Sequence, residues 1–434
     1  MPLTRQETPF REGLVRAIGR WSLVALTINC ILGSGIFGLP SQVADLLGKR
    51  SVWAVLLAGM GTAVIIACYA EVASQFSQTG GTYIYCRAAF GRLTGLQVGW
   101  MMMLSRLTAC AANANLLVIY LGTFWPQVTH PLARFAIITV LLGILLAINY
   151  RGVRDGTRVS NFFVVAKLVP LVIVALAGGY YLIGHAAVSW PHVNATPGTW
   201  RDAILLLFFA YGGYEAAMNP MGEARNPKRD APFALFVALA IITLIYTLIQ
   251  WVVVGVLPSS MHSNRPLAEV ARILLGPSGA GLVAMAALVS VYGYLSANFL
   301  TAPRATFAFA EQGDFPRWFA AVHREHRTPH VSIAVFALFC WILALAGSFT
   351  WNVTLSAVSR LFYYGAVCAA VPVLRRRQPG GAWFQLPAGS AIAVIGVVIC
   401  VALLSGVDFS KSLILLATVA IAFLNWLVVR NRAS

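Results

Sequence analysis

The chain of 434 residues is 59% hydrophobic and only 10% charged, whereas soluble domains contain about 45–50% apolar and about 25% charged residues. It is nevertheless basic, because 31 Lys and Arg residues outnumber 14 Asp and Glu residues and give a formal net charge of +17. This composition excludes an ordinary soluble protein and raises the question of where the positive charges lie.

Twelve segments are long enough and apolar enough to cross a membrane, which takes roughly 20 mostly apolar residues. The first of them has no convincing cleavage site, so we expect no signal peptide. The connections are too short for a soluble domain, and the seven Cys residues lack the spacing of a metal site. The sequence predicts an all-α integral membrane protein without a cofactor. The twelve predicted spans are 21–45, 51–77, 93–122, 132–150, 158–184, 201–222, 232–257, 279–310, 330–347, 351–373, 388–406 and 412–429.

The positive charges follow the membrane topology. If the N-terminus is cytoplasmic, 21 Lys and Arg residues fall on the cytoplasmic side, 7 on the other side and 3 within spans. An excess of Lys and Arg in cytoplasmic loops is the usual pattern of multi-pass proteins. We therefore expect both termini in the cytoplasm, a lipid bilayer as surroundings and no nucleic-acid partner.

Two of the predicted spans contain a glycine-rich interruption. The first span carries Gly33-Ser34-Gly35 near its middle, and the sixth carries Gly212-Gly213 followed by Glu215. Glycine disfavours a helix interior by about 1 kcal/mol, and interrupted helices at matching positions of two halves point to a transporter binding site. Freed amides suit a carboxylate and freed carbonyls suit an ammonium group, so a zwitterionic amino acid fits. The alternative is that small residues only allow close helix packing.

Several motifs resemble the amino acid–polyamine–organocation superfamily of secondary transporters, in particular L-type transporters and bacterial amino acid permeases. The resemblance covers most of the chain and implies a LeuT-like fold with a 5+5 inverted repeat, broken first and sixth spans, and two accessory helices. It divides the chain into a cytoplasmic segment 1–20, repeats 21–184 and 185–373, and a part 374–434 with the accessory helices and a short cytoplasmic tail. The motifs are Gly33-Ser34-Gly35-Ile36-Phe37, Tyr69-Ala70-Glu71, Thr79-Gly80-Gly81-Thr82-Tyr83, Ala89-Phe90-Gly91, Phe209-Ala210-Tyr211-Gly212-Gly213 and Gly222-Glu223-Ala224-Arg225-Asn226-Pro227-Lys228-Arg229-Asp230.

The resemblance also implies a substrate site. It places the substrate carboxylate near Gly33, Ser34 and Gly35, the ammonium group at carbonyls of the two breaks, and Phe209 over the substrate as a gating aromatic. Tyr214-Glu215 stands where the L-type branch has Trp-Asn, which leaves the substrate range open. The residues expected around the substrate are Ile31, Gly33, Ser34, Gly35, Ile36, Phe209, Ala210, Tyr211, Gly212 and Glu215, with Ser105, Tyr294 and Asn298 either lining the pocket or making helix-packing hydrogen bonds.

Ionisable groups inside spans are costly and indicate function. By resemblance, Lys167 in the fifth span occupies the place of a sodium ion and bridges spans 1, 5 and 8, either as a proton carrier or as a fixed cation. Glu215 is expected to carry a proton, contact the substrate side chain or accept structural hydrogen bonds. Glu71 and Glu223 are expected to bind loop amides or basic residues of an inner gate, and Arg106 either lines the pathway or has a structural partner.

The sequence thus predicts a sodium-independent secondary transporter of amino acids in the plasma membrane, the inner membrane of a bacterium, that works by alternating access. It leaves open proton symport or amino acid exchange, and does not fix an oligomeric state or a partner subunit. The alternatives are a transporter of polyamines or other organic cations and an amino acid sensor without transport. An enzyme is not expected, since neither HExxH nor GxSxG occurs.

Overall fold

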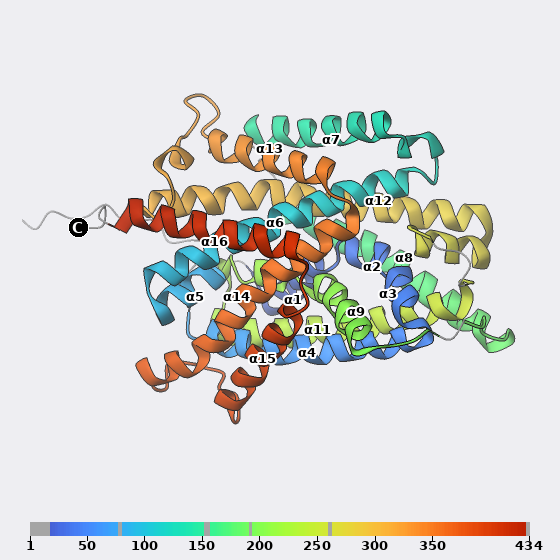
Figure 1. The fold of residues 1–434 in the computed structure, drawn as a ribbon, viewed down its shortest axis with the longest axis horizontal. Helices are drawn as coiled ribbons and strands as arrows, with labels where there is room; N and C mark the ends of the chain where they lie inside the picture. Colours follow the sequence, from blue (N-terminus) through green and yellow to red (C-terminus); the bar gives the residue numbers. More distant parts are fainter. Residues whose placement is uncertain (1–17, 77–79, 152–156, 191–192, 259–262, 431–434) are drawn as a thin grey trace, which may run out of the picture.

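The computed structural model describes residues 18–76, 80–151, 157–190, 193–258 and 263–430, so most of the predicted segment 1–20 and the tail 431–434 lie outside the described residues. Within these ranges the chain is helical (Figure 1). The elements are α1 (Arg20–Ile31), α2 (Ser34–Gly38), α3 (Pro40–Leu47), η1 (Gly48–Arg50), α4 (Ser51–Ala73), α5 (Gly81–Phe90), α6 (Arg92–Leu121), η2 (Pro126–Thr129), α7 (Pro131–Arg151), α8 (Thr157–Gly184), α9 (Pro197–Tyr211), α10 (Tyr214–Ala217), η3 (Met221–Glu223), α11 (Pro227–Val256), α12 (Pro266–Glu311), η4 (Arg317–Ala320), α13 (His330–Ala346), α14 (Phe349–Arg377), α15 (Gly389–Leu404) and α16 (Phe409–Val429).

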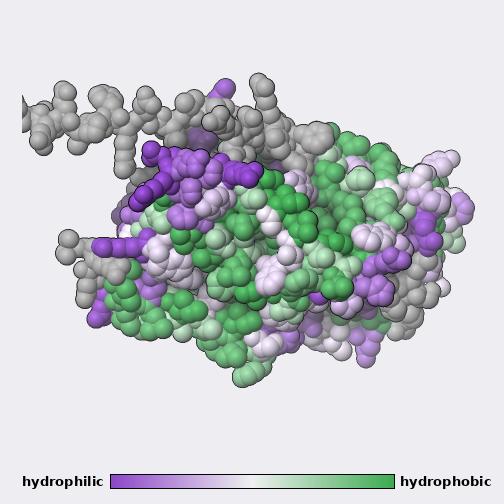
Figure 2. All heavy atoms as spheres, turned by 90° about the horizontal axis from the view of Figure 1, so that it is seen from above, coloured by the Kyte–Doolittle hydropathy of each residue, from purple (hydrophilic) through white to green (hydrophobic). Residues whose placement is uncertain are grey.

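Eight helical stretches are long and apolar enough to cross a membrane, and α1, α13 and α15 are shorter apolar helices. In Figure 2 hydrophobic residues cover the middle of the visible face, and hydrophilic residues gather toward its two ends. Large apolar side chains such as Leu132, Tyr180 and Ile183 are more than three-quarters exposed, which suits contact with lipid tails rather than water. The chain is therefore a multi-pass membrane protein. The eight stretches are Pro40–Ala73, Arg92–Leu121, Pro131–Arg151, Val165–Gly184, Pro227–Val256, Pro266–Glu311, Phe349–Arg377 and Phe409–Val429.

The helix α6 lies at the centre of the bundle. It packs against α14, α12, α13 and α16, and most of its side chains are buried. On one side of it α4 packs against α11, and α11 in turn packs against α1 and α8. The pair α7 and α13 lies along one edge of the molecule (Figure 1). This arrangement places α12 and α14 against α6, and α9 packs against α14 and α4.

Both glycine-rich interruptions are breaks in the helices. The first separates α1, which ends at Ile31, from α2, which begins at Ser34. The second separates α9, which ends at Tyr211, from the one-turn helix α10. The first predicted span is thus divided into three helices, because Pro40 starts a new helix directly after α2.

Some predicted boundaries differ from the structure. The segment predicted as 279–310 belongs to α12, which begins at Pro266 and bends at Gly276, where φ is +73°. The predicted sixth span 201–222 is helical only from Pro197 to Tyr211 and for one further turn. The reason is local, since Gly276 and Gly213 have positive φ angles, which interrupt the regular helix within an apolar segment.

Candidate functional site

The first break brings backbone and a serine hydroxyl into the centre of the protein. Gly33 has φ −126° and ψ −144°, outside helical geometry, and Ser34 and Gly35 are buried. A Cβ atom at Gly35 would lie 2.7 Å from the Cα atom of Ala210 in α9. Only glycine allows this approach, which holds the two broken helices against each other.

The second break touches the first. Gly213 has φ +116°, a conformation that favours glycine, and a Cβ atom there would overlap the carbonyl oxygen of Cys30 near the end of α1. The Glu215 carboxylate accepts a hydrogen bond of 2.9 Å from the Gly213 amide and so fixes the turn. The two interruptions, far apart in the sequence, therefore lie against each other at the ends of α1 and α9.

Lys167 fixes the end of α1. Its Nζ atom donates to the Leu32 carbonyl oxygen and to Oδ1 of Asn29, both at 2.8 Å, and approaches the Asn29 carbonyl at 3.4 Å. The side chain is buried. These bonds join α8 to α1 and satisfy carbonyl groups that the break deprives of helical partners. Lys167 of the fifth predicted span thus bonds to the first span, and its helix α8 packs against α12, which contains the predicted eighth span.

Glu215 is the acceptor at the centre of a polar cluster. Tyr363 donates to its Oε1 at 2.9 Å, and Tyr364 donates to its Oε2 at 2.8 Å. The Nε atom of Arg360 lies 3.8 Å from Oε1, and the side chains of Glu215 and Arg360 are less than a tenth exposed. The carboxylate therefore has two hydroxyl donors, one amide donor and one counter-charge.

Arg360 reaches from α14 across the second break. Its Nε atom donates to Ser105 Oγ at 3.1 Å, and its guanidinium carbon lies 5.5 Å from the centre of the Phe209 ring. It also lies directly against Gly212, where any Cβ atom would overlap the guanidinium. The structure thus brings together predicted residues from spans 3 and 6 through a span 10 arginine whose partners the sequence did not reveal.

Of the other predicted site residues, one lies at the first break and three make hydrogen bonds within the helical bundle. Tyr294 packs over Gly33, with a ring carbon 3.3 Å from where a Cβ atom would stand, so it lies at the first break. Asn298 donates at 3.0 Å to the Tyr294 carbonyl of its own helix. Ala210 already accepts at 3.0 Å from Tyr246. The Tyr211 hydroxyl donates away from the breaks, to Val55 of α4, at 3.1 Å.

The predicted gate acid Glu71 is paired at the end of α4 that lies nearest to the loop after α14. Its carboxylate accepts from Nε and Nη2 of Arg375 at 2.6 and 2.8 Å and from the Leu386 amide at 2.9 Å. Glu223 lies in η3, is partly exposed, and accepts through its backbone carbonyl from Ile18 at 3.0 Å. Glu71 therefore joins α4, α14 and the following loop, whereas Glu223 orders the chain before α11.

A second buried acid at the same end was not singled out from the sequence. Asp314, in the loop after α12, lies 2.6 Å from Nη1 of Arg87 and 2.6 Å from Nε of Arg92, and Tyr83 also donates to it. Burial raises the pKa of the Asp314 carboxyl to about 6, and the two guanidinium groups act in the opposite direction. The carboxyl is therefore charged at neutral pH and ties α12 to α5 and α6.

The sequence profile of the amino acid permease family matches residues 18–424. The chain belongs to this family. Its relatives include the methylthioribose transporter of Bacillus subtilis, 27% identical over 90% of this chain and 88% of that protein. They also include the serine/threonine exchanger SteT of B. subtilis, 28% identical with 85% of each chain covered, and the branched-chain amino acid permease BcaP of B. subtilis, 25% identical over 97% of this chain and 93% of that protein.

Membership of the family fixes the class of activity. The permease is a membrane transporter of amino acids or related solutes and not an enzyme. It belongs to the amino acid–polyamine–organocation superfamily that the motifs indicated, and the family implies the LeuT fold.

Proposed function

We propose that the permease carries amino acids across the plasma membrane by alternating access, with the substrate bound where the two breaks meet. The observation that carries this proposal is the contact between Gly213 and Cys30 together with the close approach of Gly35 to Ala210. Interrupted helices expose backbone donors and acceptors side by side, and a zwitterion needs both. Ser34 adds a buried hydroxyl that has no hydrogen-bond partner among the described residues.

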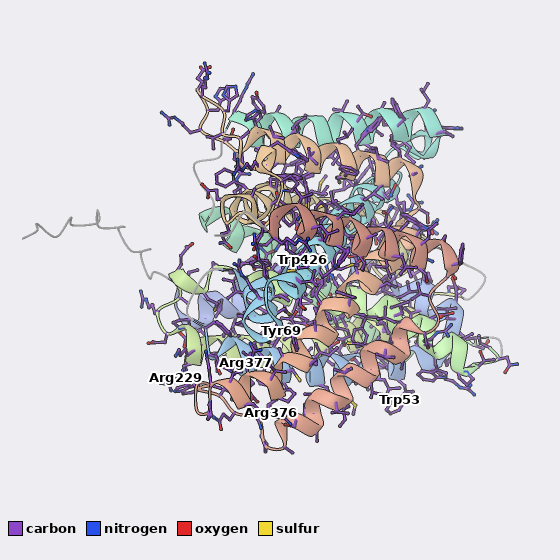
Figure 3. The ribbon with its side chains drawn as sticks, turned by 60° about the vertical axis from the view of Figure 1, so that its left-hand side comes forward. Trp53, Tyr69, Arg229, Arg376, Arg377 and Trp426 are labelled. Carbon is purple, nitrogen blue, oxygen red and sulfur yellow. The ribbon has the colours of Figure 1, made fainter. Side chains whose placement is uncertain are left out.

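The proposed topology has twelve spans, with 21–184 and 185–373 as inverted repeats and both termini in the cytoplasm. Twelve spans require α1 to α3 to act as one broken span and α9 with α10 as another. The distribution of arginine supports this orientation: Arg229, Arg376 and Arg377 gather at one end of the helices, and Trp53 lies toward the other (Figure 3). An excess of arginine marks the cytoplasmic side.

The proposed transport is independent of sodium. The Lys167 ammonium already supplies a positive charge to the Leu32 carbonyl at the first break, where a cation would otherwise have to neutralise the exposed backbone dipoles. Proton symport and amino acid exchange both remain compatible with this arrangement. Transport of polyamines is disfavoured, because the cations Lys167 and Arg360 outnumber the carboxylate of Glu215 among the described residues at the breaks.

Uptake by the purified permease in liposomes tests the proposal. We expect accumulation of amino acids that is unchanged when choline chloride replaces sodium chloride; loss of most of the uptake would refute sodium independence. An inward proton gradient drives symport into empty vesicles, whereas exchange requires vesicles preloaded with amino acid. Binding without uptake in any of these vesicles would instead favour the sensor, and uptake of polyamines alone would overturn the proposed site.

A further inference from the structure

Two guanidinium groups near the breaks have donors that nothing in the described chain accepts. The Nη1 atoms of Arg106 and of Arg360 are both buried and have no hydrogen-bond partner among the described residues. A buried charged donor without an acceptor costs several kcal/mol. Such an arrangement is stable in a transporter if an anionic group of the cargo completes it.

The two arginines lie on α6 and α14, two helices that pack against each other. Arg360 donates through Nε to Ser105, the residue that precedes Arg106 in α6, while its other end lies against Gly212 at the second break. Arg106 follows Ser105 in α6, and α6 packs against α12, whose Tyr294 lies over Gly33 at the first break.

The charges around this region do not balance. Glu215 and Arg360 neutralise each other at 3.8 Å, and Lys167 is directed to backbone and Asn29 oxygens of α1. Arg106 has no ion pair among the described residues. A zwitterionic substrate adds no net charge. Its own carboxylate and ammonium groups therefore leave the positive charge of Arg106 uncompensated.

We propose that Arg106, together with the free Nη1 of Arg360, forms an anion subsite for the substrate side chain, so that the permease prefers amino acids with a side-chain carboxylate. This inference rests on the proposed binding of amino acids at the breaks. Arg106 is the specificity-determining residue, and Arg360 is held at the second break by Glu215, Ser105 and the Phe209 ring. The same two charges repel the side chains of lysine and arginine.

The test compares ligands that differ only in charge. Purified permease is titrated with the potassium salts of L-glutamate and L-aspartate and with L-glutamine, L-asparagine and L-lysine, and affinity is taken from the concentration dependence of thermal stabilisation. We expect glutamate to bind at least tenfold more tightly than glutamine, because a hydrogen bond between charged groups contributes about one to two powers of ten in affinity. L-lysine is expected to bind more weakly than L-glutamine.

Variants assign the preference to Arg106. Arg106→Gln should lower the affinity for glutamate at least tenfold more than that for glutamine, and Arg106→Lys should keep part of the preference because it keeps the charge. Arg50→Gln, at an exposed arginine of η1, is the matched control and should keep the full preference. If Arg106→Gln does not fold, the comparison of ligands on the wild-type protein and on Arg106→Lys still tests whether the permease prefers glutamate to glutamine.

Each outcome has a distinct meaning. Tighter binding of glutamine than of glutamate, or a full glutamate preference in Arg106→Gln, overturns the anion subsite while leaving amino acid transport intact. Stabilisation by potassium chloride equal to that by potassium glutamate assigns the guanidinium groups to an inorganic anion and also overturns it. Absence of binding by all of these amino acids would instead contradict the proposed function itself.

Discussion

The buried pair of Glu215 and Arg360 allows a quantitative test of the polar cluster. Two unit charges about 4 Å apart interact by about 4 kcal/mol at an effective dielectric constant of 20, and the pair lies at 3.8 Å. Glu215→Gln keeps the size of the side chain and leaves Arg360 buried without a counter-charge. We expect a loss of about 3–5 kcal/mol in the free energy of unfolding.

Removal of both charges should cost less than removal of either one. In Glu215→Gln with Arg360→Gln no unpaired charge remains, so the double variant should be less destabilised than either single variant, which gives a coupling energy of more than about 3 kcal/mol. Tryptophan fluorescence during reversible denaturation in detergent measures the four proteins, since the chain has 12 Trp residues. Additive losses in the double variant would refute the reasoning.

An exposed pair serves as the control for this cycle. Arg272 lies only 2.8 Å from Glu269, yet its side chain is 51% exposed. The corresponding cycle with Glu269→Gln and Arg272→Gln should give a coupling of less than about 1 kcal/mol. A larger coupling in the exposed pair than in the buried one would show that distance, and not burial, determines the interaction.

Two further predictions concern the breaks themselves. Gly213→Ala should destabilise the permease by about 1–3 kcal/mol and abolish uptake, because φ is +116° and the new methyl group overlaps the Cys30 carbonyl; Gly143→Ala, with open space around it, should leave thermal unfolding and uptake nearly unchanged. Lys167→Met should cost about 1–3 kcal/mol and abolish uptake, because the buried Leu32 carbonyl loses its donor. Equal thermal stability and full uptake of either break variant would contradict its prediction.

The sequence alone determined the class of the protein and the position of its breaks. Apolar composition identifies the segments that lie in lipid, since each span must be apolar along its whole length. Gly33, Gly212 and Gly213 revealed the interruptions because glycine is unfavourable in a helix interior. The same local reasoning located Lys167, Glu215 and Arg106 within spans, and the cost of burying a charge implied that each has a function or a partner.

Only the tertiary structure decided which groups meet. Arg375 pairs with Glu71 across 304 residues, and Arg360 donates to Ser105 across 255. Nothing in the periodicity of one helix specifies the rotation or depth of another, so partners drawn from different spans cannot be read from either segment. The packing of α6, α9, α14 and the first break around one point therefore turned isolated buried charges into a paired cluster, and it left the guanidinium of Arg106 as the charge that the described residues do not balance.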